Sequence, residues 1–208
     1  MHIFSSAFGY LADLILPPRK TDPLVRELTI ADLQSAALED GTLSYRDPRV
    51  RALIWELKYH ASAPALALAG EYVADLLTAV ASEEIGKPLL IPIPMHKKRR
   101  KERGHNQTEV LCEAALSYMK VLGQNYIEYA PNVLVRTRYT PSQQGLERNK
   151  RLINVENSME VSYPKRVVGR VCVVIDDVST TGATCKEAVR ALRTAGARKV
   201  ICIALAQS

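Results

Sequence analysis

Residues 171–184, VCVVIDDVSTTGAT, constrain the fold more than any other part of the chain. Five consecutive apolar residues, VCVVI, predict a strand buried on both faces, which is typical of parallel sheets. A polar stretch follows, and residues 200–205 form another continuous apolar run. Between them, apolar side chains recur at helical spacing up to Gly196, a residue type that often ends helices. They are Cys185, Ala188, Val189, Leu192 and Ala195. This order predicts a right-handed βαβ unit.

The alternation of strands and helices extends towards the amino terminus. Asp47 followed by Pro48 predicts a helix start, and a second helix is expected near residues 62–64. Residues 106–109, NQTE, resemble a capping box that opens a further helix. Short apolar runs predict strands at residues 89–93 and 133–135. We therefore predict an α/β fold with a parallel sheet flanked by helices.

Residues 1–44 show a weaker pattern of apolar residues than residues 45–208. Residues 1–44 are assigned to a small amino-terminal helical segment, and residues 45–208 to the main domain. The apolar start of the chain lacks an early Lys or Arg and a small-residue cleavage site, which favours a short helix over a signal peptide. No run approaches the roughly 18 apolar residues that cross a bilayer. We expect a cytoplasmic protein with no membrane span.

Composition and cysteine spacing exclude several other classes. The chain is 47% hydrophobic and 24% charged, which excludes disordered and collagen-like proteins. Its cysteines are Cys112, Cys172, Cys185 and Cys202. They show no C-x-x-C spacing, and three of them fall in apolar runs or stripes. Free cysteine behaves as a small hydrophobe in cores, so we predict neither a disulfide framework nor a zinc site.

The polar stretch after the strand at 171–175 is suited to a phosphate group. A parallel strand delivers the chain to the carboxyl edge of the sheet, where open α/β sheets bind ligands. The following helix start offers unpaired N–H groups and a partial positive charge. Thr180, Thr181 and Thr184 add hydroxyl donors, and Gly182 permits close approach of the backbone. These features together predict a monophosphate site.

Asp176 and Asp177 add a second requirement on the ligand. Their charges repel phosphate, but carboxylates accept hydrogen bonds from vicinal hydroxyls, directly or through a divalent metal. A phosphate on one side and a diol on the other describe ribose 5-phosphate. Each feature alone is common at helix caps and strand ends. Their contiguity makes the combination informative.

A basic run precedes the helix predicted after residue 106. Residues 96–105, HKKRRKERGH, hold six Lys or Arg against one acid, within a chain of formal net charge +6. Such a run is usually a solvated face, and it is also typical of a nucleic-acid patch. Its place between a strand end and a capped helix favours a small anion. Charge alone does not separate pyrophosphate from DNA, although the scarcity of nearby aromatic residues argues against a stacking platform.

The chain resembles a known family in five segments. Residues 172–184 match throughout the signature for phosphoribosyl pyrophosphate (PRPP) of the type I phosphoribosyltransferases. LIWELKYH at 53–60, IPIPMHKKRRKERGHNQTEVL at 91–111, LVRTRYTPSQQGLERNKRLINV at 134–155 and the carboxyl-terminal GARKVICIALAQ resemble its ComF branch (ComFC/GntX-like). The resemblance covers roughly residues 45–208. Many relatives begin with a four-cysteine zinc segment that this chain lacks, so that we expect no structural zinc.

The resemblance implies roles for individual residues. Asp176 and Asp177 would face the ribose hydroxyls, and they are taken as catalytic together with Arg103. The 5-phosphate would be held by Val178, Ser179, Thr180, Thr181, Gly182, Ala183 and Thr184. The pyrophosphate loop would contain Met95, His96, Lys97, Lys98, Arg99, Arg100 and Arg103, followed by Gly104, Asn106 and Gln107. Residues 138–165, a long polar stretch of the kind that forms functional lids, would be a flexible loop with Thr140, Gln143, Arg148, Arg151 and Asn154.

The implied activity is transfer of phosphoribosyl from PRPP to an unidentified acceptor, with Mg²⁺ bound together with PRPP near the two aspartates. Two alternatives stay open: a PRPP sensor without catalysis, and a competence or DNA-uptake factor that binds single-stranded DNA or a competence protein. A homodimer also stays open. The acceptor side is expected from residues 1–60, with Trp55, Lys58 and Tyr59 as candidates, although Trp55 fits a core position better.

Overall fold

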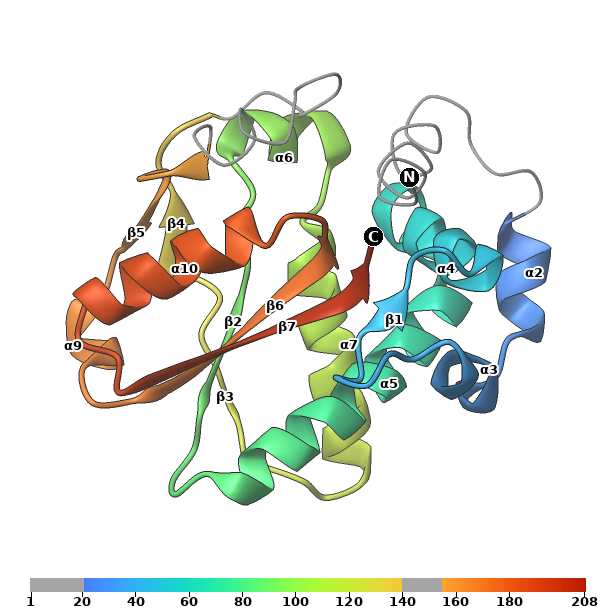
Figure 1. The fold of residues 1–208 in the computed structure, drawn as a ribbon, viewed down its shortest axis with the longest axis horizontal. Coiled ribbons are helices and arrows are strands. Elements are labelled where there is room, and N and C mark those ends of the chain that lie inside the picture. The colour runs from blue at the N-terminus through green and yellow to red at the C-terminus, as the bar shows by residue number, and fades with distance from the viewer. Residues whose placement is uncertain (1–20, 140–154) are drawn as a thin grey trace.

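The computed structural model describes residues 21–139 and 155–208. Its centre is a five-stranded sheet in which every neighbouring pair of strands is parallel (Figure 1). The spatial order of the strands is β1 (Leu43–Ser44), β7 (Lys199–Gln207), β6 (Val171–Ser179), β2 (Leu89–Pro92) and β3 (Glu128–Tyr129). The predicted α/β class and parallel sheet are confirmed.

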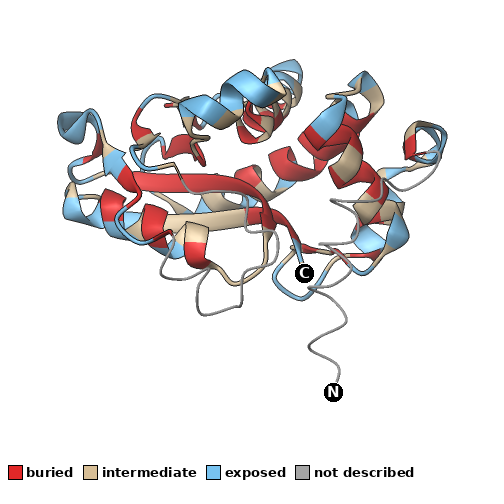
Figure 2. Ribbon diagram, turned by 90° about the horizontal axis from the view of Figure 1, so that it is seen from above, coloured by how far each residue is buried: buried red, intermediate tan, exposed pale blue. Residues whose placement is uncertain are grey.

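Helices cover both faces of this sheet. One face carries α4 (Pro48–Tyr59), α5 (Ala63–Glu83) and α7 (Gln107–Val121), and the other carries α10 (Ala183–Thr194). Because side chains alternate along a strand, Val173 and Ile175 of β6 pack with the first group of helices, while Cys172 and Val174 pack with α10. Figure 2 shows β6 as a buried strand between the two layers.

The two central strands differ from the prediction in extent and in burial. β6 extends beyond the two aspartates to Ser179. Its pairing with β7 continues over this part, where Asp176 lies opposite Ala204 and Ser179 lies opposite Gln207. The apolar run at residues 200–205 is typical of a strand buried on both faces, but the first five residues of β7 are exposed or only partly buried. The reason is that β1 pairs only with Ala206 and Gln207, so the rest of that edge of β7 has no strand beside it among the described residues.

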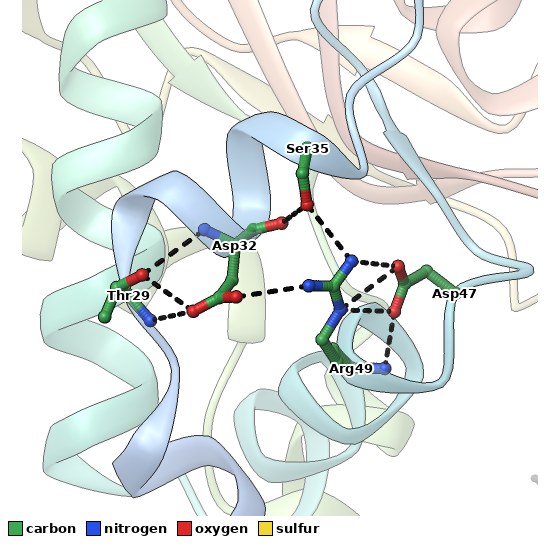
Figure 3. A network of polar contacts seen from close by, with 5 residues as sticks. All are labelled: Thr29, Asp32, Ser35, Asp47 and Arg49. Carbon is green, nitrogen blue, oxygen red and sulfur yellow. Dashed lines mark hydrogen bonds and ion pairs between the residues drawn. The ribbon is translucent and has the colours of Figure 1, made fainter.

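The described part of the amino-terminal segment joins the same core. It contains α2 (Thr21–Glu27), α3 (Ile30–Ser35) and β1, and Val25 and Leu33 pack with residues of α4 and α5. Thr29 and Asp32 form a capping box at the start of α3. Arg49 joins this box to the start of α4, because its guanidinium bonds Asp32, Ser35 and Asp47 (Figure 3). The division at residue 44 stays a prediction.

The helix starts predicted after residue 47 and near residues 62–64 are confirmed. Asp47 accepts a hydrogen bond from the Arg49 N–H at the start of α4, and α5 begins after Ser62. Within the described residues, α5 alone is long and apolar enough to cross a membrane, which is weak evidence because core helices pass the same test. Its Leu68, Val73 and Leu77 are buried in the core.

A second, smaller sheet stands beside the main one. The strand predicted at residues 133–135 is β4 (Leu134–Arg136), which pairs antiparallel with β5 (Met159–Val161). Glu187 of α10 accepts a hydrogen bond from the Met159 N–H, and Arg190 donates to the Met159 carbonyl. This clamp holds the small sheet against α10. Figure 1 shows it at the same end of the molecule as α6 (Lys97–Arg103), while α9 (Pro164–Val167) leads into β6.

Candidate functional site

The two aspartates lie at the carboxyl end of β6, side by side in the strand. Asp176 is 6% exposed and Asp177 is 8% exposed. The Asp177 N–H donates to Asp176 Oδ1 at 2.9 Å, and the Val178 N–H donates to Asp177 Oδ1 at 2.8 Å. Two buried carboxylates on adjacent residues repel one another when both are ionised. The surroundings therefore have to separate their pKa values.

The two pKa values are shifted in opposite directions. Burial, and then the charge of Asp177, raises the pKa of Asp176 well above its ordinary value. Burial acts in the same direction on Asp177, but the charge of Lys58, the Val178 N–H and hydrogen bonds from Asp176 and Gln107 outweigh it and lower the pKa of that carboxyl. Asp177 thus carries the negative charge of the pair.

Lys58 and Gln107 bring two other helices to Asp177. Lys58, near the end of α4, is 5% exposed and its Nζ lies 3.3 Å from Asp177 Oδ2. Gln107, the first residue of α7, donates from Nε2 to the same oxygen at 3.1 Å. The sequence placed Lys58 on the acceptor side and Gln107 at the end of the expected pyrophosphate loop. Their contact with Asp177 was missed because it joins positions that are 119 and 70 residues apart in the chain.

The segment predicted to hold a phosphate forms the turn between β6 and α10. Gly182 precedes α10 with φ of 71°, a left-handed conformation that favours glycine. Thr181 Oγ1 accepts from the Ala183 N–H at 3.4 Å. Val178 and Ala183 are buried, whereas Ser179, Thr180, Thr181, Gly182 and Thr184 are partly exposed. Hydroxyl and N–H donors therefore meet between Ser179, two residues beyond Asp177, and the start of α10 at Ala183.

The residues expected in the pyrophosphate loop are mostly helical. Met95 and His96 lie in the turn after β2, but α6 takes in Lys97, Lys98, Arg99, Arg100 and Arg103. His96 caps this helix by accepting from the Lys98 N–H, and Gly104 ends it at φ of 82°. The predicted capping box at residues 106–109 is replaced by a different cap, in which the Asn106 side chain accepts from the Thr108 N–H. Asn106 and Thr108 also donate to the Ile93 carbonyl, which fixes the turn against α7.

Arg136 is a candidate site residue that was not predicted from the sequence. It ends β4, and its Nε donates to the Pro94 carbonyl at 3.1 Å. Burial lowers its pKa, and the charge of Asp176 opposes that effect. A partly buried arginine therefore links the turn after β2 to the charge of Asp176. The sequence indicates this role only by an arginine at the end of a short apolar run, just before a long polar stretch.

Aromatic side chains flank α6 on two sides. The Tyr59 ring lies 4.1 Å from the Trp55 ring between centroids, and Arg103 Cζ lies 5.5 Å from the Tyr59 centroid. The Tyr139 ring contacts His96 edge-on, with Lys98 Nζ at 4.8 Å. Trp55 is partly exposed, which corrects the expectation of a core position. Aromatic residues are thus close to the basic run in space although they are distant in sequence.

Several predictions are not tested by this geometry. Thr140, Gln143, Arg148, Arg151 and Asn154 lie outside the described residues. In the parts that are described, no group of three or more His, Cys, Asp or Glu side chains could hold a metal ion. All four cysteines are free. The assignments of catalytic, PRPP-binding and pyrophosphate-binding roles stay predictions, as does the expectation of no structural zinc.

Comparison with known proteins finds a matching domain model and several relatives. Residues 125–208 match the model of the phosphoribosyl transferase domain. The DNA utilization protein YhgH of Escherichia coli O157:H7 is 29% identical over 184 residues, which cover 88% of this chain and 72% of the relative. Competence protein F of Haemophilus influenzae is 29% identical over 112 residues, 53% of this chain and 46% of that protein.

Solved structures give a more distant likeness. The glutamine PRPP amidotransferase from B. subtilis, complexed with ADP and GMP, is 20% identical and aligns over 73% of this chain and 30% of its own, with a TM-score of 0.42. A hypoxanthine phosphoribosyltransferase from Staphylococcus aureus is 11% identical over 69% of this chain and 63% of its own, with a TM-score of 0.41. TM-scores this low support no conclusion about the site.

Proposed function

We propose that this chain, which has a phosphoribosyl transferase domain match and is similar to YhgH and Competence protein F, binds PRPP and transfers its phosphoribosyl group to an acceptor, releasing pyrophosphate. The observation that carries the proposal is the β6–α10 turn. It presents Asp177 as an ionised carboxylate and, from the next residues, a cluster of hydroxyl and N–H donors at a helix start. Phosphate and vicinal hydroxyls are the two groups that these donors and acceptors match.

The reaction breaks the bond between the ribose anomeric carbon and the pyrophosphate oxygen. Negative charge then grows on pyrophosphate and positive charge on the ring. Cations fixed before the reaction stabilise the leaving group without reorganisation. Arg99 and Arg103 of α6 and the partly buried Arg136 are the candidates for this role, and the carboxylate of Asp177 stabilises the ring. We assign no general base.

Magnesium fits this arrangement only as an ion shared with the substrate. Asp176 and Asp177 are two carboxylates, and Mg²⁺ is commonly held by one or two carboxylates plus substrate phosphates. When bound there, the ion would neutralise charge on pyrophosphate. The protein's own residues would orient the sugar.

The proposal is tested by turnover of PRPP. Wild-type protein with Mg²⁺ should release pyrophosphate when a panel of nucleobases and other nitrogen nucleophiles is supplied. The Asp177→Asn variant should lose this release, because it removes the charge that faces the ring. Release at the same rate in both proteins would exclude this site. PRPP binding with no turnover of any acceptor would favour a PRPP sensor.

A second candidate function is the binding of single-stranded DNA. The specific observation in its favour is that Tyr59 and Tyr139 lie beside basic residues of α6. Basic grooves combined with aromatic rings are typical of single-strand binding surfaces, and two relatives are named as DNA utilization and competence proteins. A joint Arg99→Ala, Arg100→Ala and Arg103→Ala variant should lose salt-sensitive binding of an oligothymidylate, measured by fluorescence anisotropy, while Asp177→Asn keeps it. Equal binding by both variants would contradict this function.

A further inference from the structure

Gln107 has a buried side-chain oxygen with no hydrogen-bond partner among the described residues. Its Nε2 donates to Asp177 Oδ2 at 3.1 Å, whereas its Oε1 is buried and accepts no hydrogen bond from any residue that the structure describes. Leaving a buried polar atom unpaired costs about 1–3 kcal/mol. Such an atom beside a candidate site is therefore informative, because a bound donor would remove that cost.

The orientation of this amide follows from its neighbours. The Asp177 carboxylate is ionised and only accepts hydrogen bonds, so that the amide must turn its NH₂ group towards it. The carbonyl oxygen then has to point away from Asp177. Turning the amide over would bring two acceptor oxygens together and leave the NH₂ group without this partner. The unpaired oxygen is thus a consequence of the charge on Asp177.

The surroundings of Asp177 leave little of its carboxylate for a ligand. Oδ2 receives Lys58 Nζ and Gln107 Nε2, and Oδ1 receives the Val178 N–H. A carboxylate has about four acceptor positions; these contacts use three, and the Asp176 side chain donates to the fourth. A ligand with two adjacent hydroxyl groups needs two acceptors. Asp177 can supply one of them where a ligand hydroxyl takes the place of Asp176. Gln107 Oε1, on the residue that bonds Asp177, is an acceptor without a donor among the described residues.

We propose that Gln107 is a ligand-binding residue whose Oε1 accepts a hydrogen bond from one ribose hydroxyl, so that the diol is shared between Asp177 and Gln107. The inference rests on the proposed PRPP site and adds a residue that determines its specificity. Gln107 belongs to α7, outside the segment that matches the phosphoribosyl transferase domain. A sugar that lacks this hydroxyl leaves Oε1 unpaired, and sites built to pair a hydroxyl reject such analogues strongly.

The test compares three sugar phosphates by isothermal titration calorimetry: ribose 5-phosphate, 2-deoxyribose 5-phosphate and 3-deoxyribose 5-phosphate. Wild-type protein should bind ribose 5-phosphate roughly tenfold more tightly than one of the deoxy sugars, which identifies the hydroxyl. In Gln107→Leu this ratio should fall to about twofold or less, because the buried acceptor is gone. Binding of that deoxy sugar should change less than binding of ribose 5-phosphate.

Two further variants keep the test decisive. Gln107→Lys retains an N–H donor towards Asp177 but has no acceptor, and it should lose the discrimination in the same way. Gln124→Leu makes the same change beyond the far end of α7, where Gln124 Oε1 accepts from Thr78, and should keep the wild-type ratio. An unchanged ratio in both Gln107 variants would overturn the inference even if PRPP is turned over. Absence of any sugar phosphate binding by the wild type would overturn the proposed function as well.

Discussion

Replacing Lys58 by methionine is expected to lower the free energy of unfolding by about 3–5 kcal/mol, the usual cost of leaving a buried charge without its partner. Lys58 Nζ lies 3.3 Å from Asp177 Oδ2, and both residues are less than a tenth exposed. Methionine is similar in length and is apolar, so that the change removes the positive charge and leaves little empty volume. Asp177 then has to stay ionised without its cation or to take up a proton.

Urea denaturation followed by circular dichroism measures this effect. The double variant Lys58→Met/Asp177→Asn should lose less stability than Lys58→Met, because neither partner then carries an unpaired charge. Lys199→Met is a matched control: Lys199 pairs with Glu84 but is about half exposed, and exposed pairs contribute roughly 0–1 kcal/mol. A loss for Lys58→Met no larger than that for Lys199→Met would show that the buried pair does not stabilise the fold.

Replacing Gly182 by valine is expected to weaken binding of ribose 5-phosphate by about 100-fold. Gly182 has φ of 71°, where an L-residue costs about 1–2 kcal/mol. A β-branched side chain therefore drives the turn towards another conformation and moves the N–H groups at the start of α10. Loss of two hydrogen bonds to phosphate, at about 1.5 kcal/mol each, corresponds to the expected change in affinity.

Calorimetry with ribose 5-phosphate measures the change. Gly123→Val is a matched control, since Gly123 also has φ of 71° and an added Cβ would meet no atom within 4 Å at either glycine. Gly123 follows α7 at the end away from the aspartates, so this variant should bear the same strain and keep its affinity. Equal affinity of Gly182→Val and Gly123→Val would show that the turn does not hold the phosphate.

The sequence predicted best what is encoded over short distances. The β6–α10–β7 unit and the helix starts at Asp47 and Ser62 were all found from local apolar spacing and caps. The extent of β6 and the partial burial of β7 were not predicted, because they depend on which strands pair beside them. Only the sheet order, which brings β1 against one end of β7, decides that burial.

In the candidate site, too, the contiguous residues were predicted and the contacts between distant residues were not. Asp176, Asp177 and the phosphate turn are contiguous, so that one segment was enough to predict them. Lys58 and Gln107 reach Asp177 only because α4 and α7 pack on the face of the sheet beside β6. Aromatic residues are scarce near the basic run in the sequence but not in the structure, because Tyr59 and Tyr139 reach α6 from other parts of the chain. Such contacts are set by packing and leave no local pattern.

Isothermal titration calorimetry of the wild-type protein with PRPP in the presence of Mg²⁺ tests the PRPP site most directly. One site per chain should bind, ribose 5-phosphate should compete for it, and Gly182→Val should bind far more weakly. Absence of heat and of competition at millimolar ligand would contradict the assignment of the β6–α10 turn as a site for a phosphorylated ribose.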